Sequence, residues 1–304
     1  MWKSLPFALA LLFSVAGDVG AQDDVDEKPL TSGEASIGLP SFFGVSGLRN
    51  MVDARTPTRV DLRALLGYDW TRQDVTGPVA EKTVDTSEGA LTVGASALTF
   101  LELGAHFPFY VVKRQTVDVF NQSSEKEESV GRIVSLDLGL KAGRSLDFIT
   151  KSLHWLSLAP YMLVHVTGAP GITRLDGFLS FEVGGAATVA VLDDRLSFHL
   201  DLAYAHIGVK TAAVRCRLGI FGVPIGVADD LVVRIGGYVD GLSVVKTNTR
   251  HDLLDVSFGV QGLLIKYIIL EVTGGYRAYQ GLSFQLRDRG TGGLEANVGG
   301  RIEF

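Results

Sequence analysis

The sequence predicts an all-β fold, namely a transmembrane antiparallel up-and-down β-barrel of about 12 strands. Segments in which apolar and polar residues alternate recur from residue 60 to the end of the 304-residue chain, which is typical of strands. The mean hydropathy is positive, +0.25, although 20% of the residues are charged. No stretch beyond residue 21 offers about 18 uninterrupted apolar residues, so a transmembrane helix does not explain this hydropathy. Strands that each show half of their residues to lipid do explain it.

The first 21 residues have the pattern of a secretory signal peptide. Lys3 precedes an apolar stretch over residues 5–16, and Gly20 and Ala21 are small, which predicts cleavage after Ala21. A membrane-anchoring helix is the alternative, but the apolar stretch is too short to span a bilayer and Asp18 follows it closely.

Residues 22–58 are expected to form a leader outside the barrel or a partial plug. Residues 22–36 are polar and acidic, which favours a disordered leader. Residues 38–58 are rich in Gly, Pro and Ser, and they either lie beneath the barrel or fold partly into its lumen. The pattern does not decide between these placements.

The barrel itself is expected over residues 59–304. In each predicted strand, apolar residues share one face and most of the polar and charged residues share the other, because side chains alternate across a strand. The predicted strands cover residues 60–70, 91–97, 101–109, 134–142, 156–164, 179–189, 198–204, 215–220, 233–239, 254–260, 268–272 and 294–304.

The connections between these strands are expected to alternate in length. Short turns are predicted near Phe100, Asp193 and Asp229. Long polar loops are predicted over residues 71–88, 113–130, 240–252 and 277–290, and residues 144–154 form a longer connection on the short-turn side. Short turns on one side and long loops on the other are typical of transmembrane barrels, and an even strand count places both chain ends on the short-turn side.

The apolar faces are expected to point outward, toward lipid. A soluble barrel this large would have to pack about 12 apolar inner faces into one core, whereas barrels of about 8 strands already fill their interior. The charged faces then line the lumen. The candidate lumen-lining residues are Arg63, Glu102, His106, Asp137, Lys141, Glu182, His199, Asp201, Arg215, Arg217, Arg234, Asp255, Glu271 and Arg301.

These inward charges have two interpretations. Opposed charges can set the ion or solute selectivity of a pore, or they can form salt bridges that only satisfy buried groups in a narrow lumen. Arg215, Arg217 and Arg234 lie on strands that are consecutive in sequence. The acidic residues Glu102, Asp137 and Glu182 are expected on the opposite wall. This segregation predicts a field across the lumen.

No residue pattern predicts catalysis. His199 and Asp201 share an inward face and could orient an imidazole, but the sequence fixes no nucleophile beside them, so a structural pair is expected. We therefore expect no catalytic residues, no metal site and no cofactor. The lone Cys216 cannot form an internal disulfide. The net charge of −6 argues against nucleic acid as a partner.

The last strand carries a family resemblance. Residues 294–304 alternate between an apolar face and a polar face and end on Phe304, as in the C-terminal strand of Gram-negative outer-membrane β-barrel proteins, which this chain resembles as a porin-like class. The resemblance implies the outer membrane as location, a periplasmic leader, and as partners membrane lipid, small solutes and the barrel-assembly machinery, which would act through the C-terminal strand.

The resemblance also implies a function, a passive channel for ions or small polar solutes. A closed structural or surface-interaction barrel is the first alternative. A barrel-embedded hydrolase is the second alternative, because outer-membrane phospholipases are similar in size and strand number. Those enzymes place a Ser–His pair on the lipid-facing surface, and the outward faces predicted here contain neither residue type. An enzyme is therefore not expected.

Overall fold

The computed structural model describes residues 39–303, except residues 42, 58, 77–79, 120–121, 134, 168–178, 193, 208–210, 224–230, 247–252, 265–266 and 281–286. The predicted signal peptide, the acidic stretch 22–36 and the terminal Phe304 lie outside the described residues. Among the described residues, no helix is long and apolar enough to cross a membrane.

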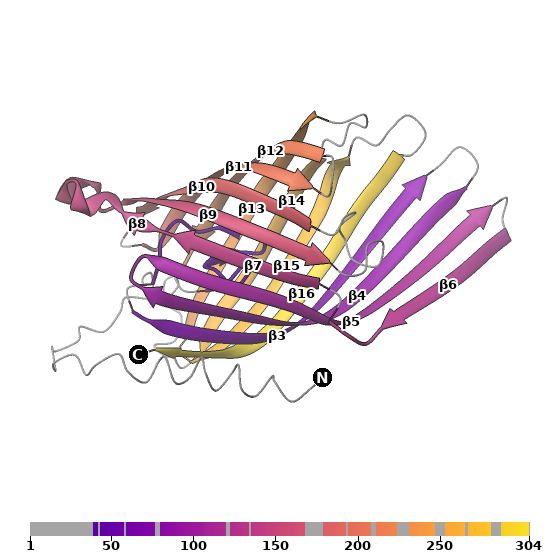
Figure 1. Cartoon of the computed structure of the whole chain (residues 1–304), viewed down its shortest axis with the longest axis horizontal. Helices are drawn as coiled ribbons and strands as arrows, with labels where there is room; N and C mark the ends of the chain where they lie inside the picture. The colour runs from indigo at the N-terminus through magenta and orange to yellow at the C-terminus, as the bar shows by residue number, and fades with distance from the viewer. Residues whose placement is uncertain are drawn as a thin grey trace. The chain divides into compact units, whose positions relative to one another are not determined.

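The described chain forms a closed antiparallel barrel, as predicted (Figure 1). The main sheet has 14 strands, of which β6 and the two-residue β8 stand apart from the closed wall. Pairing of β16 with β3 and of β9 with both β7 and β10 closes the remaining strands into a ring. The wall strands are β3 (Asp61–Thr76), β4 (Glu81–Leu98), β5 (Leu101–Val119), β7 (Ser135–Ala142), β9 (Leu156–Thr167), β10 (Leu179–Val191), β11 (Leu196–Ile207), β12 (Thr211–Gly222), β13 (Leu231–Lys246), β14 (Leu253–Leu264), β15 (Ile268–Gln280) and β16 (Arg287–Glu303).

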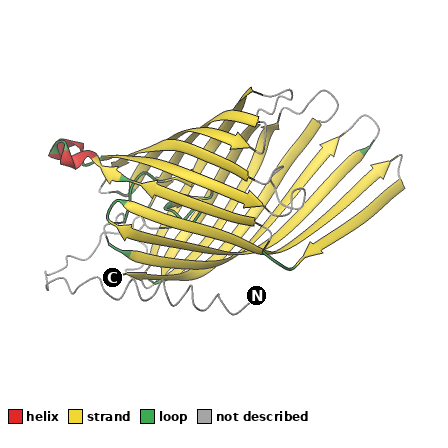
Figure 2. Ribbon diagram, viewed as in Figure 1, coloured by secondary structure: helices red, strands yellow, loops and turns green. Residues whose placement is uncertain are grey.

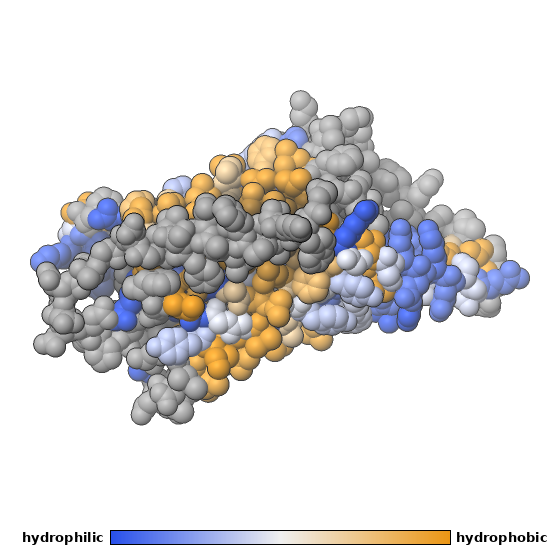
Figure 3. All heavy atoms as spheres, turned by 60° about the horizontal axis from the view of Figure 1, so that its bottom comes forward, coloured by the Kyte–Doolittle hydropathy of each residue, from blue (hydrophilic) through white to orange (hydrophobic). Residues whose placement is uncertain are grey.

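The register places apolar side chains outside and charged side chains inside. On β7, Leu138 and Leu140 are 41% and 38% exposed, whereas their neighbours Asp137 and Lys141 are 1% and 0% exposed. The same alternation runs around the wall, and Figure 3 shows apolar side chains over the barrel surface with hydrophilic ones toward the protruding end at the right. An exposed apolar band around a barrel is the surface that lipid covers in a membrane.

β3, β4, β5 and β6 continue well beyond most of the wall, and β16 stays paired with β3 up to Arg287 and Thr76. β6 (Gln122–Val130) pairs with the second half of β5, from Val111 to Val119, while β7 pairs with the first half. β3 and β4 remain paired up to Thr76 and Glu81, so that β3–β6 protrude at the right of Figure 1. The prediction of long loops over residues 71–88 and 113–130 is therefore wrong. These residues are polar on both faces because both faces lie outside the apolar band.

The other end of the barrel carries short connections. β4 ends at Leu98 and β5 begins at Leu101, and β10 ends at Val191 four residues before Arg195 leads into β11. We call this the short-turn end. The longer connection predicted over residues 144–154 is present there as β8 (Arg144–Ser145) and the 3₁₀ turns η1 (Leu146–Phe148) and η2 (Lys151–Leu153), shown as the helical element in Figure 2.

The described part of residues 39–57, which we call the plug segment, lies inside the barrel (Figure 1). It contains a small hairpin of β1 (Gly47–Leu48) and β2 (Met51–Val52). A bridge between Pro40 and Ser46 closes a second turn. Nearly all described residues from 39 to 55 are buried, so the interior of the barrel is a core built between the wall and this segment.

Candidate functional site: the lumen and its plug

Both ends of the described plug segment lie at the same mouth of the lumen. Its first described residue, Leu39, accepts a hydrogen bond of 3.2 Å from Arg234 near the start of β13. Near its last residues, Thr56 donates a 3.1 Å hydrogen bond to the carbonyl oxygen of Gly143, just after β7. Both contacts lie at the short-turn end. The segment therefore folds back within the lumen and does not thread the barrel from end to end.

The tip of the plug segment reaches the middle of the barrel. The backbone N–H of Asn50 donates to the hydroxyl of Tyr238, midway along β13, at 3.2 Å. Arg49 precedes it with a φ of 52°, in the left-handed region that non-glycine residues rarely adopt. Its guanidinium lies against Gly275 and Gly293, where a Cβ atom would collide with or crowd it. The absence of side chains at these positions makes room for Arg49.

A buried carboxylate on β5 binds the plug segment and two cations. Glu102 lies 2.6 Å from Lys141 Nζ and 3.2 Å from Arg63 Nη2, and all three side chains are fully buried. It also accepts a 2.6 Å hydrogen bond from the backbone N–H of Ser46 and a 2.9 Å hydrogen bond from its hydroxyl. Three predicted lumen residues thus come together around one plug residue.

A second anchor lies on the opposite wall, on β13 and β14. Arg234 donates to Gln261 at 2.8 Å and to the carbonyl oxygens of Leu39 and Gly47. Gln261 donates in turn to the carbonyl oxygen of Pro40 at 2.8 Å. This amide and guanidinium pair thus binds main-chain oxygens of the plug segment.

The third anchor surrounds Asp53, a plug residue that is fully buried. It accepts from Arg55 at 2.8 Å and from the Thr188 hydroxyl at 3.2 Å, and Arg234 Nη1 lies 3.5 Å away. Burial by itself raises the pKa of Asp53, but the positive charges of Arg55 and Arg234 outweigh burial and hold that pKa below its usual value. The carboxylate is therefore charged at neutral pH.

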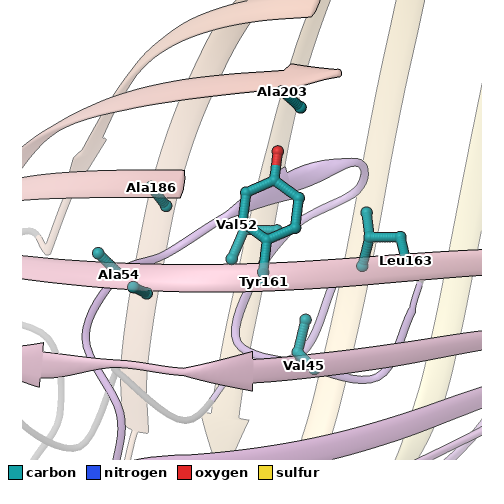
Figure 4. Packing of buried hydrophobic residues seen from close by; sticks show 8 residues of the cluster. Val45, Val52, Ala54, Tyr161, Leu163, Ala186 and Ala203 are labelled. Atoms are coloured by element: carbon teal, nitrogen blue, oxygen red, sulfur yellow. The ribbon is translucent and has the colours of Figure 1, made fainter. Parts of the chain in front are cut away.

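Apolar contacts fill the space between these anchors. Figure 4 shows Val45, Val52 and Ala54 of the plug segment beside Tyr161 and Leu163 of β9. Small wall residues complete this cluster, namely Ala159, Ala186 and Ala203. Two further clusters bind other parts of the segment, one with Leu39, Leu65, Leu263 and Ile269 and one with Leu48, Met51, Phe221 and Tyr238.

Inward-facing glycines let the plug backbone approach the wall. Gly94, Gly104 and Gly143 lie on or next to β4, β5 and β7, respectively. A Cβ atom at any of them would overlap with a plug carbonyl oxygen, from Gly44, Phe43 and Ala54 in that order. Glycine is the residue that permits such backbone approach. The abundance of glycine is thus explained at these positions by the segment inside.

A charged network lines one side of the lumen, on the neighbouring strands β10, β11, β12 and β13. Arg217 binds Glu182 at 2.6 Å and Asp201 at 3.3 Å, and Arg215 binds Asp240 at 2.9 Å and Glu182 at 3.2 Å. β11 alone separates the strand of Glu182 from that of the two arginines. The predicted segregation of Glu182 from the arginines across the lumen is therefore wrong. Charges pair because unpaired ions are costly to bury.

Two histidines lie in a row of titratable groups farther from the short-turn end. His106 contacts the Thr92 hydroxyl at 2.8 Å and Glu88 at 3.5 Å. His165 hydrogen-bonds to Asp137, which pairs in register with His106 on one side and His165 on the other. Among the described residues, no group of three or more His, Cys, Asp or Glu side chains is arranged to hold a metal ion.

The structure places the candidate lumen residues as follows. Arg63, Glu102, Lys141, His199, Asp201 and Arg234 lie against the plug segment. Arg215, Arg217 and Glu182 belong to the charged network, His106 and Asp137 lie in the row of titratable groups, and Arg301 binds Asp61 at 2.9 Å. Glu271 is buried, and Asp255 is partly buried. Sequence reasoning missed Ser46 and Asp53, because they lie in an irregular segment that gives no periodic signal. Gln261 and Thr188 lie on or next to predicted strands, and the expected pairing of Thr188 with His199 is confirmed, but they are not among the candidate lumen residues because they carry no charge.

Solved structures similar to this chain include barrels of bacterial outer membranes. An outer membrane channel from Pseudomonas putida F1 matches with a TM-score of 0.49 and 9% identity, over 81% of this chain and 98% of that one. The translocator domain of the autotransporter NalP from Neisseria meningitidis matches with a TM-score of 0.45 and 13% identity, over 79% and 88%. The NanC porin matches with a TM-score of 0.43 and 12% identity, over 77% and 100%.

A match to this sequence is found neither among protein families nor among curated proteins. Sequence identities of 9–13% indicate a similar fold only and give no information on activity. The closed antiparallel wall, with charged groups inside and an apolar band outside, is the architecture of an outer-membrane β-barrel.

Proposed function

We propose that this protein is an outer-membrane channel for ions or small polar solutes, closed at rest by the plug segment and conducting when that segment leaves the lumen. The chemistry of the wall behind the plug carries the proposal. Arg63, Glu102, Lys141 and Arg234 face the segment with charged groups. Water and ions can solvate such groups once the segment is gone, so the wall suits a hydrated passage. The signal-like residues 1–21 support export to the outer membrane.

The geometry disfavours a translocator that passes its own N-terminal chain through the barrel. Leu39 and Thr56 both contact the short-turn end, and the tip between them stops beside Tyr238. A chain in transit would connect the two mouths. A hairpin that enters and returns through one mouth is suited to closing the lumen and to leaving by the way it entered.

A reversible lock on the plug segment tests the proposal. A Cβ atom at Gly139 would lie 3.2 Å from Val45 Cγ1, which suits a disulfide in the double variant Val45→Cys/Gly139→Cys. The same Cβ atom would lie 2.9 Å from the Phe43 carbonyl oxygen, so the plug backbone must shift slightly there when the disulfide forms. In planar bilayers, and in a Cys216→Ala background, we expect the parent protein to show transient openings and the oxidised lock to show none. Reduction should restore them. The two single-cysteine variants are the controls and should not respond to oxidant.

An unplugged variant provides the opposite test. Gly44 has a φ of 78°, and a Cβ atom there would overlap with the carbonyl oxygen of Val93. Gly44→Val should therefore expel the plug segment without changing the wall, and conductance should become continuous. If this variant folds and inserts but never conducts, the channel proposal fails and a permanently closed structural barrel is the better account.

One observation favours a hydrolase as second candidate. The Ser197 hydroxyl lies 2.8 Å from His199 Nε2, His199 Nδ1 lies 3.0 Å from the Thr188 hydroxyl, and that hydroxyl donates to Asp53. This series of hydrogen bonds would let His199 accept the proton of the Ser197 hydroxyl. However, all four groups are buried and Arg55 covers Ser197 at 3.1 Å. A serine-directed fluorophosphonate should label the protein, and Ser197→Ala should not be labelled, if this candidate holds.

A further inference from the structure

The outgoing half of the plug segment is bound through its main chain. The backbone N–H of Val52 donates to Asp201 at 3.1 Å, and that of Ala54 donates to the Thr188 hydroxyl at 3.0 Å. On the other side, Lys141 Nζ donates to the carbonyl oxygens of Asp53 and Arg55 at 2.9 and 2.6 Å. Each of these four consecutive plug residues thus contributes one main-chain group to a wall side chain.

These four hydrogen bonds bind the main chain of the plug segment and involve none of its side chains. Asp201 and Thr188 supply acceptors from β11 and β10, and Lys141 supplies a donor from β7, which β9 separates from β10. Main-chain N–H and C=O groups are common to every peptide and must be paired when they are buried. Wall side chains that hydrogen-bond to such atoms can therefore bind peptides as a chemical class.

The side chains that do matter define a short pattern. Val52 and Ala54 lie in one buried cluster with Ala159, Ala186 and Ala203 and are 1% and 0% exposed, so a larger side chain at either position would have to displace packed atoms. Between Val52 and Ala54, the Asp53 carboxylate meets two wall groups, the Thr188 hydroxyl at 3.2 Å and Arg234 at 3.5 Å. The lumen therefore prefers an acidic residue between two small apolar residues.

We propose that the unplugged lumen binds short extended peptides with an acidic residue between small apolar residues, in the place that residues 52–55 occupy at rest. This inference rests on the proposed function, because the segment must leave before a peptide can enter. It names the substrate class of the channel. In the resting state the plug segment competes with any free peptide at the high effective concentration of a tethered ligand.

The test uses full-length, detergent-purified Gly44→Val and fluorescence anisotropy of labelled hexapeptides. AADAAS carries the pattern and shares only the central Asp-Ala pair with residues 51–56, and AAKAAS reverses the central charge. We expect saturable binding of AADAAS and at least about tenfold weaker binding of AAKAAS. N-methylation of AADAAS at the backbone nitrogens of its second and fourth residues, which take the places of Val52 and Ala54, removes the two donors to Asp201 and Thr188 and should also weaken binding about tenfold or more, because each lost hydrogen bond costs severalfold.

A wall variant ties the binding to the site. Thr188→Val keeps the shape and removes the acceptor for the Ala54 position, so AADAAS affinity should fall severalfold. Thr92→Ala, on the inward face of β4 beside His106, is the matched control and should bind normally. The oxidised Val45→Cys/Gly139→Cys lock, made in the protein that keeps Gly44, should not bind AADAAS. Lys141→Met replaces Thr188→Val, and Gly47→Val replaces Gly44→Val, if a heat-shift gel shows that the first choice is unfolded.

The results separate this proposal from the channel. Equal binding of AADAAS, AAKAAS and the N-methylated peptide, or no binding by an unplugged variant that conducts, overturns the peptide site and leaves the channel. Binding with the expected pattern by a variant that never conducts overturns the channel and leaves the peptide site. An unplugged variant that neither binds nor conducts overturns both.

Discussion

At the scale of single residues, many of the buried charges that the structure describes in the barrel interior have a specific partner of opposite charge. Glu102 is an example. It lies between Lys141 and Arg63 and accepts a further hydrogen bond from the backbone N–H of Ser46. Removing one partner leaves the others buried without compensation, which costs more than the pair contributes. The plug segment is thus bound most firmly where it completes a group of wall charges.

Glu102→Gln should loosen the plug segment. The variant leaves Lys141 and Arg63 without their shared carboxylate, at a cost of about 3–5 kcal/mol for a buried pair. We expect longer openings in planar bilayers and faster cleavage of the plug segment by an added protease. Glu127→Gln removes an exposed carboxylate that binds Arg114 on the protruding strands, and it should change neither measurement.

Leu138→Arg should impair membrane insertion. Leu138 is 41% exposed on the apolar face of β7, and an arginine near the midplane of a lipid-facing strand costs about 2–4 kcal/mol. The measurement is the fraction of protein that folds into vesicles, read from its heat-dependent shift on a gel. Leu138→Met should insert normally. Normal insertion of the arginine variant would show that this face does not meet lipid.

At the scale of elements, sequence patterns predict what lies inside the apolar band. All of the predicted strands are present, because each shows alternation between lipid and lumen. The ends of β3, β4 and β5 and the whole of β6 were predicted as loops, since Ser123–Glu128 and its neighbours are polar on both faces and leave no periodic signal. Alternation marks a strand only where its faces meet different surroundings.

The plug segment could not be placed from sequence for a related reason. Its structure follows from distant contacts, such as Val52 with Asp201 and Ser46 with Glu102, and not from a local period. Glycine, proline and serine are equally common in exposed linkers. The candidate lumen residues follow from strand alternation, but their grouping around Asp53 and Ser46 depends on a segment that the pattern left undecided.

The protruding hairpin of β5 and β6 should be dispensable for barrel formation. Thr116 and Glu125 face each other in register, so residues 117–124 can be replaced by Asn-Gly, which favours a tight hairpin turn. We expect unchanged insertion and an unchanged heat shift. A deletion of equal length within β7 is the comparison and should abolish both. Loss of insertion in the shortened hairpin would show that the protrusion takes part in assembly.

At the scale of the whole molecule, the two ends of the barrel are unlike. Asp61 pairs with Glu303, so the first and last wall strands meet at the short-turn end. The connection with Ile149 lies at this end, and the protruding strands with Glu127 lie at the other. Transmembrane barrels of this kind keep short turns on the periplasmic side and longer extensions outside.

This orientation predicts the accessibility of two single cysteines. In a Cys216→Ala background, Glu127→Cys should react with a membrane-impermeant maleimide in intact cells, because the Glu127 side chain is 49% exposed on β6. Ile149→Cys, at a residue 65% exposed, should react only after the outer membrane is permeabilised. Labelling of Ile149→Cys in intact cells would mean that the barrel is inserted the other way round.

The glycines behind the plug segment constrain how the chain can diverge during evolution. A side chain at Gly94, Gly104 or Gly143 is excluded by backbone atoms of Gly44, Phe43 or Ala54, which belong to a segment encoded well upstream. Selection can relax at those wall positions only after the upstream segment has been lost or rerouted. Descendants that lack the segment should therefore acquire larger residues at all three positions, and those substitutions should appear together with the loss.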